Sequence, residues 1–145
     1  MTIRFTAIAL ALLSLPAIAC ATRSLSPEAV PLDRVECARC RMLISTRTGG
    51  GEIVSAKAET RFYDDISCLA ADWAAHADGA RAFVRTGDDQ WSDAQVASYA
   101  QLAGAHSAMG SGIAAFAGAS DAQAVDRAGR ALTFAEVVHL TGAPR

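Results

Sequence analysis

Two short segments concentrate the sulfur of this chain. The first contains Cys37, Cys40 and Met42 in the run Cys-Ala-Arg-Cys-Arg-Met. The second contains Met109 in the run His-Ser-Ala-Met-Gly-Ser-Gly, residues 106–112. Of the three methionines, only the initiator lies outside these segments, as do two of the four cysteines, Cys20 and Cys68. Thiolate and thioether sulfurs are soft donors that together favour Cu(I) over hard ions. The two segments are therefore candidates for binding one copper ion between them.

The spacing of these donors suggests how they would meet. Cys40 and Met42 lie two apart in an alternating run that predicts a strand, so their side chains would point the same way. Cys37 lies in the preceding loop and would supply a third sulfur. Met109, which glycines flank, would close from the other half of the chain, and His106 could add an imidazole. Because thiols must lose their protons to bind, affinity for the ion should rise with pH.

Other interpretations of the cysteines stay open. The pair Cys37 and Cys40 could be a structural disulfide clip, or the centre of a thiol–disulfide reductase acting on copper-ligand cysteines of another exported protein. Thioredoxin-like pairs, however, sit at a helix N-terminus, and a strand is expected here. A closed zinc site would need four Cys or His ligands. Cys68, in a predicted apolar helix, is interpreted as a small buried hydrophobe.

The N-terminus predicts export. Residues 1–19 combine Arg4, an apolar run too short to span a bilayer and the Ala-Ile-Ala pattern of a cleavage site, so we interpret them as a signal peptide. Cys20 follows at once and is predicted to be lipidated, which would anchor a periplasmic protein to a membrane. Residues 20–35 lack periodicity and are expected to form a tether. If Cys20 is lipidated, three thiols remain, so either one pair forms a disulfide or metal keeps the pair reduced.

Residues 36–145 are expected to form the copper-binding domain, with lobes at about 36–90 and 91–145. The chain has 13 Lys and Arg against 15 Asp and Glu, a formal net charge of −2, and no basic cluster follows a helix face. Nucleic acid is therefore not an expected partner. The sequence has no Ser/His/Asp arrangement, phosphate loop or hydrolase motif, so we expect a protein that is not an enzyme.

The hydrophobic periodicity predicts a mixed α/β fold of the α+β type, in which each lobe runs strand, strand, helix, strand. The first lobe is expected to have strands at 40–45, 52–56 and 80–85 and a helix that opens at 62–65, capped by Asp64 or Asp65. The second is expected to have strands at 96–101, 112–118 and 129–134, a helix at 121–128 capped by Ser120, and a helix at 134–140 capped by Thr133. An N-cap role explains the paired aspartates without acid–base chemistry.

Four motifs in this order resemble the NosL-like family, the copper-binding accessory lipoproteins of nitrous oxide reductase maturation; they occupy residues 37–42, 62–68, 91–94 and 109–116. The resemblance implies a two-lobed fold of strand-strand-helix-strand units. It also implies a periplasmic, lipid-anchored Cu(I) chaperone that serves denitrification by delivering copper to apo nitrous oxide reductase or its ABC-transporter complex. It makes Cys40 the foremost copper ligand, with Met42 and Met109 next. The family commonly has glycine where this chain has Arg41.

Overall fold

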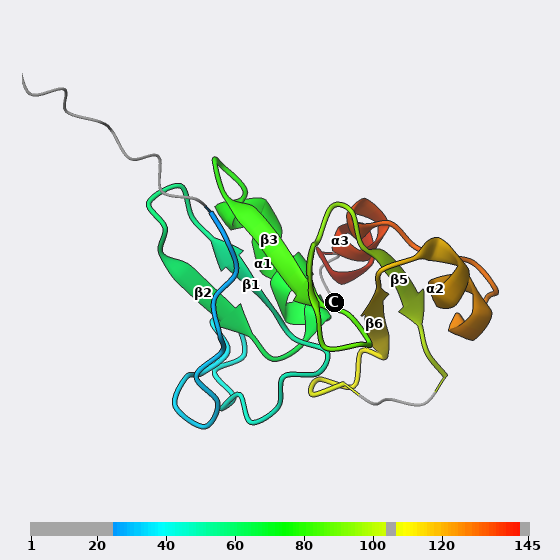
Figure 1. Ribbon diagram of the computed structural model, residues 1–145, viewed down its shortest axis with the longest axis horizontal. Helices are drawn as coiled ribbons and strands as arrows, with labels where there is room; N and C mark the ends of the chain where they lie inside the picture. Colours follow the sequence, from blue (N-terminus) through cyan, green and yellow to red (C-terminus); the bar gives the residue numbers. More distant parts are fainter. Residues whose placement is uncertain (1–24, 104–106, 143–145) are drawn as a thin grey trace, which may run out of the picture.

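The computed structural model describes residues 25–103 and 107–142 (Figure 1). The predicted signal peptide, the predicted lipidation site Cys20 and the candidate ligand His106 lie outside these residues. In chain order the elements are β1 (Gly51–Val54), β2 (Thr60–Tyr63), α1 (Ile66–His76), β3 (Arg81–Arg85), β4 (Trp91–Asp93), β5 (Ser98–Gln101), β6 (Ile113–Phe116), α2 (Ala119–Val125) and α3 (Phe134–Gly142). None of the helices described is both long and apolar enough to cross a bilayer.

The first four strands form one antiparallel sheet in the order β2-β1-β3-β4, and α1 packs behind it (Figure 1). Gly51 lets the helix come close, because a Cβ there would lie 2.6 Å from Leu69 Cδ1 and 2.5 Å from the carbonyl oxygen of Phe83. Ile53, two residues along, points to the same face and is fully buried. The core of this half of the molecule therefore lies between β1 and α1.

The other face of this sheet is crossed by the N-terminal segment. The backbone N–H of Glu28 donates to Oε1 of Glu52 on β1 at 2.9 Å, and Arg81 Nη1 donates to the carbonyl oxygen of Leu25 at 3.2 Å. Further along, the Ile44 amide donates to the Val35 carbonyl at 3.0 Å. Residues 25–35, part of the predicted tether, thus make hydrogen bonds with the folded domain.

The second half contains the antiparallel pair β5-β6 with α2 and α3. It joins the first half where α3 packs on α1. The Phe134 ring meets Trp73 of α1 edge to face, with ring centroids 5.8 Å apart, and lies 6.0 Å from the ring of Tyr99. An isolated parallel bridge between Thr86 and Ala115 connects the two sheets directly.

The predicted mixed α+β fold is confirmed, and several elements lie where periodicity placed them. Asp65 caps α1, as predicted for one of the two aspartates. Thr133 and Glu136 form a capping box at α3, in which the Thr133 amide donates to Glu136 Oε2 at 2.7 Å and the Glu136 amide to Thr133 Oγ1 at 3.3 Å. The second helix, by contrast, begins at Ala119 after an N-cap at Gly118, so the predicted Ser120 cap is wrong.

Two predicted strands are also wrong. Residues 40–45 make only a single bridge, between Leu43 and Glu36, and β1 pairs instead with β2, which includes residues expected at a helix start. Residues 129–134 make only a single bridge, between Leu132 and Tyr99. Alternating apolar and polar residues indicated strands at both places. Strand formation also needs the free edge of a partner strand, and both edges of β1 are already paired, with β2 and β3.

Candidate metal centre

A tight loop places the first two cysteines. The Cys37 amide donates to the Met42 carbonyl at 2.8 Å, and the Arg41 amide donates to the Cys37 carbonyl at 3.0 Å. The amide after Cys37 donates to the Phe62 carbonyl at 2.8 Å, which fixes the loop to β2. Arg41 has a φ of +66°, in the left-handed region that glycine enters most easily. The loop leaves Cys37 fully buried and Cys40 partly exposed.

The junction between β2 and α1 places two further groups. Asp64 and Asp65 connect the two elements, and Asp65 accepts a hydrogen bond from the Ser67 amide at 2.7 Å as the N-cap of the helix. Asp64 points instead toward the cysteine loop. Cys68 lies in the first turn of α1 and is buried. The start of the helix therefore carries a carboxylate and a thiol on the side that faces Cys37 and Cys40.

These residues form one compact cluster of ligand atoms. The sulfurs of Cys37, Cys40 and Cys68 and a carboxylate oxygen of Asp64 all lie within 4.8 Å of one another. Cys40 Sγ is 3.5 Å from Asp64 Oδ1 and 3.6 Å from Oδ2. All three cysteines in the described part of the chain are free, with no disulfide among them. We call this set the Cys3Asp cluster.

Hydrogen bonds and burial set the protonation of the cluster. A hydrogen bond from the Cys68 thiol lowers the pKa of Cys37 far below its ordinary value, against the effect of burial and with help from the Cys40 and Asp64 amides. The same hydrogen bond raises the pKa of Cys68, and burial raises it further. Burial is also the main cause that raises the pKa of Cys40 and of Asp64. These opposite directions favour ionisation of Cys37 over Cys40, Cys68 and Asp64.

The donor set fits a soft or borderline ion. Three cysteine sulfurs exclude Mg²⁺ and Ca²⁺, which prefer oxygen, whereas copper and zinc both accept thiolate ligands. The spacing is close to what a single ion needs, since metal–sulfur bonds are about 2.3 Å long for zinc. An ion entering the cluster would displace the protons of the thiols that bind it.

The structure brings some of the predicted ligands together. Cys37 and Cys40 share the cluster, but Cys40 and Met42 do not project from a strand as expected, because the backbone turns between them. Met42 and Met109 expose 47% and 45% of their surface. The roles of Met42, Met109 and His106 as ligands stay predictions.

Sequence reasoning missed Asp64 and Cys68. An N-cap needs only one carboxylate, so the second aspartate of the pair was free for another role. The odd number of thiols was a further signal, because a buried third cysteine near a Cys-x-x-Cys pair can complete a metal site. The interpretation of Cys68 as a small buried hydrophobe was correct about its burial, but it left out the contact with Cys37.

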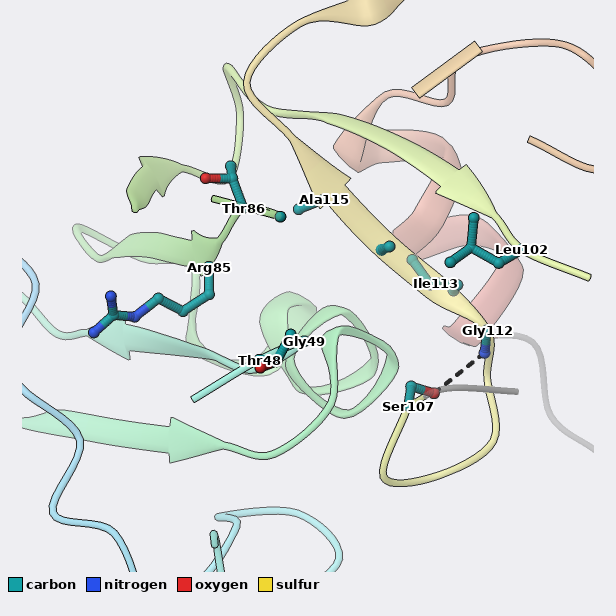
Figure 2. Close-up of a pocket in the computed structure, with 11 residues that line it drawn as sticks. Thr48, Gly49, Arg85, Thr86, Leu102, Ser107, Gly112, Ile113 and Ala115 are labelled. Carbon is teal, nitrogen blue, oxygen red and sulfur yellow. Dashed lines mark hydrogen bonds between the residues drawn. The ribbon is translucent and has the colours of Figure 1, made fainter. Parts of the chain in front are cut away.

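A separate cavity of about 140 Å³ lies between the two halves (Figure 2). It is lined by Thr48, Gly49, Arg85, Thr86, Gly87, Leu102, Ser107, Gly112, Ile113, Ala114 and Ala115. The guanidinium of Arg85 points away from it in Figure 2. Its lining residues include no cysteine, histidine or carboxylate, so we place the candidate chemistry at the Cys3Asp cluster.

Comparisons with known proteins support the fold. No protein family model matches the chain, and no curated protein sequence matches it. Among solved structures it is similar to the crystal structure of the copper chaperone NosL from Shewanella denitrificans, with a TM-score of 0.59 and 20% sequence identity. The match covers 70% of this chain and 85% of that one. The chain therefore has a NosL-like fold.

Proposed function

We propose that this protein is a copper metallochaperone that binds one Cu(I) ion as cargo and passes it to another protein. The observation that carries the proposal is the Cys3Asp cluster, in which three sulfurs and one carboxylate converge within 4.8 Å. Soft sulfur donors favour Cu(I) among the available metals. The structural similarity to a copper chaperone supports the same assignment.

The three cysteine sulfurs of the cluster are unequally buried, which suits transfer of the copper ion to another protein. Cys37 and Cys68 are buried, while Cys40 is partly exposed at the surface end of the cluster. A ligand of the acceptor protein can approach the ion only from that end, so we propose that Cys40 is the first sulfur exchanged. The exposed thioether of Met42, two residues away, is the nearest soft group in sequence to assist that exchange.

Thiol–disulfide reductase chemistry, the alternative for the same cysteines, fits this geometry less well. The attacking sulfur of a reductase must be both ionised and accessible. Here the thiol with the lowered pKa, Cys37, is fully buried, and the accessible thiol, Cys40, has a pKa raised by burial. We therefore favour binding and transfer over redox turnover, and expect the reduced protein to be inactive in an insulin reduction assay.

The cellular location of the protein and the recipient of its copper are also part of the proposal. The signal-like residues 1–19 support export, and Cys20 supports a lipid anchor that would hold the protein at a periplasmic membrane surface. The sequence resemblance supports an apo copper enzyme such as nitrous oxide reductase, or its transporter complex, as the recipient of the copper.

A competition titration tests the proposal. Reduced protein is titrated with Cu(I) in the presence of bicinchoninate, a chromogenic Cu(I) chelator, and we expect it to remove one equivalent from the chelator. Loss of an outer-shell group costs ten- to 100-fold in metal affinity, so Cys40→Ser, which removes a ligand, should lower affinity by about 100-fold or more. X-ray absorption should report a first shell dominated by sulfur.

A matched pair of aspartate variants serves as control. Asp64→Asn removes the carboxylate of the cluster, whereas Asp78→Asn changes an exposed aspartate beyond the end of α1. We expect only the first to weaken Cu(I) binding. A wild-type protein that leaves Cu(I) with the chelator, or a Cys40→Ser variant of unchanged affinity, would contradict the proposal.

A further inference from the structure

The carboxylate of Asp65 does more than cap a helix. It is fully buried and accepts three hydrogen bonds, of which only the one from the Ser67 amide at 2.7 Å belongs to the N-cap. The other two come from the second half of the molecule: Ser111 Oγ donates to Oδ1 at 2.9 Å, and the Met109 amide donates to Oδ2 at 3.0 Å. One side chain thus joins the start of α1 to a loop more than 40 residues away.

The loop that it holds, residues 107–112, has a shape of its own. The Gly112 amide donates to Ser107 Oγ at 3.2 Å, as Figure 2 shows, and Ser107 Oγ lies 3.1 Å from Ser111 Oγ. Gly112 has a φ of +67°, and a Cβ there would lie 2.9 Å from the carbonyl oxygen of Leu102. The loop is therefore a formed turn, and the hydrogen bonds to Asp65 fix where it lies against α1.

The position of this loop bears on the metal site because Asp65 lies between two members of the Cys3Asp cluster in the chain. Asp64, the residue before it, contacts Cys40, and Cys68 in the first turn of α1 contacts Cys37. The backbone of Met109 is thus attached to the same end of α1 that supplies two members of the Cys3Asp cluster. The Met109 side chain is exposed.

We propose that Asp65 is a positioning residue for copper binding: it holds the backbone of Met109 beside the start of α1, so that the Met109 thioether joins the copper ligands and slows release of the ion. This inference rests on the proposed copper-binding function. Asp65 itself does not touch the metal. It acts through Met109, the donor that the described part of the second half would contribute to the site.

Asp65→Asn separates this role from capping. Asparagine caps helices about as well as aspartate, so the hydrogen bond from Ser67 is kept. With Oδ1 still accepting from Ser67, the –NH₂ takes the place of Oδ2, the oxygen that accepts from the Met109 amide, and an –NH₂ cannot accept that hydrogen bond. We expect Asp65→Asn to speed the transfer of Cu(I) to bicinchoninate by about tenfold, the low end of outer-shell effects. Met109→Leu should speed it by a similar factor, and the double variant should be no faster than either single one.

Three further measurements sharpen the test. X-ray absorption should report one sulfur fewer around copper in Asp65→Asn, as in Met109→Leu, which a role in capping alone would not produce. Ser111→Ala, which leaves the helix cap untouched, should speed release in the same direction by a smaller factor. Asp121→Asn, at an exposed aspartate in the first turn of α2, should leave release unchanged.

The outcomes are distinguishable. If the wild-type protein binds no Cu(I), the proposed function fails and this inference fails with it. If the wild type binds Cu(I) but Asp65→Asn releases it as slowly, or with the same sulfur count, only the inference is overturned. Additive effects of Asp65→Asn and Met109→Leu would also overturn it, because they would show that Asp65 acts on the cluster by another route.

Discussion

The half built on β1 to β4 and the half built on β5 and β6 are held together in different ways. In the first, four strands are paired and α1 packs closely on the sheet because of Gly51. In the second, β5 and β6 form a two-stranded sheet with isolated bridges to Leu132 and Thr86. This half joins the rest through α3 on α1, the bridge at Thr86 and the hydrogen bonds to Asp65. The second half therefore has the smaller sheet of the two.

The candidate ligands divide between the two halves in the same way. All four members of the Cys3Asp cluster come from the first half, and the second half offers Met109 on a loop. A site that must bind an ion tightly and still release it needs fixed donors and one adjustable donor. Under the proposed function, the first half would therefore hold the fixed donors, and Met109 of the second half would be the adjustable one.

The strongest test of this difference between the halves is Phe134→Ala. Phe134 is buried at the contact between α3 and α1, against Trp73 and Tyr99. Truncating a buried phenylalanine costs about 3–5 kcal/mol, so we expect a loss of that order in the free energy of unfolding by denaturant. Leu140→Ala on the same helix, at a residue that is 53% exposed, should cost less than about 1 kcal/mol.

Hydrogen exchange measured on Phe134→Ala shows which half of the molecule loses stability. If the halves differ as described, Phe134→Ala should speed exchange of amides in β5 and β6 much more than in β1 and β3. Equal acceleration in both sheets would show that the two halves unfold as one unit, and the distinction between them would be wrong.

A second test concerns an unusual group in the first half. Glu52 on β1 is fully buried, its Oε2 has no hydrogen-bond partner within the described structure, and burial raises its pKa from 4.5 to about 7. Between these two values the native state keeps a proton that the unfolded chain loses, so stability should fall as pH rises from 4.5 to 7. The shift corresponds to about 3 kcal/mol.

Glu52→Gln should remove the fall in stability that ionisation of Glu52 causes as pH rises. Glutamine does not ionise and can still accept the hydrogen bond from the Glu28 amide. We expect the variant to match the wild type at pH 4 and to exceed it by about 3 kcal/mol at pH 8, measured by urea unfolding at both values. Glu59→Gln, at an exposed residue, is the control. The same difference at both pH values would mean that Glu52 does not titrate as described.

The smallest expected effect on stability comes from a substitution in the cysteine loop, Arg41→Gly. Arg41 adopts a left-handed φ of +66°, which costs a residue with a Cβ about 1 kcal/mol that glycine does not incur. Arg41→Gly also loses an exposed ion pair with Glu36, at 2.7 Å, which contributes between about zero and 1 kcal/mol. We expect a net gain in unfolding free energy of up to about 1 kcal/mol, measured by denaturant unfolding.

Arg39→Gly in the same loop provides the comparison for this variant, because Arg39 is not among the residues with positive φ. It should lower stability slightly through the greater freedom of the unfolded chain. If Arg41→Gly destabilises as much as Arg39→Gly, then the relief of backbone strain at Arg41 does not outweigh the freedom that glycine gives the unfolded chain. The left-handed φ also gives a physical reason why glycine suits this position.

Some features could be predicted because they depend on neighbouring residues. The caps at Asp65 and Thr133 follow from side chains that bond amides two or three residues away. The helix of residues 66–76 and the strand of residues 81–85 follow from hydrophobic periodicity. The same local reasoning failed at residues 40–45, because alternation does not reveal whether a partner strand is available.

The sequence by itself determined which donors are present and that Cys37 and Cys40 lie near each other, since only two residues separate them. Only the tertiary structure decided that Asp64 and Cys68 join them, and that Asp65 holds the Met109 loop. These contacts span more than 20 residues of chain. They depend on how β2 and α1 pack against the cysteine loop, because side chains distant in sequence meet only when the strands have paired and the core has closed.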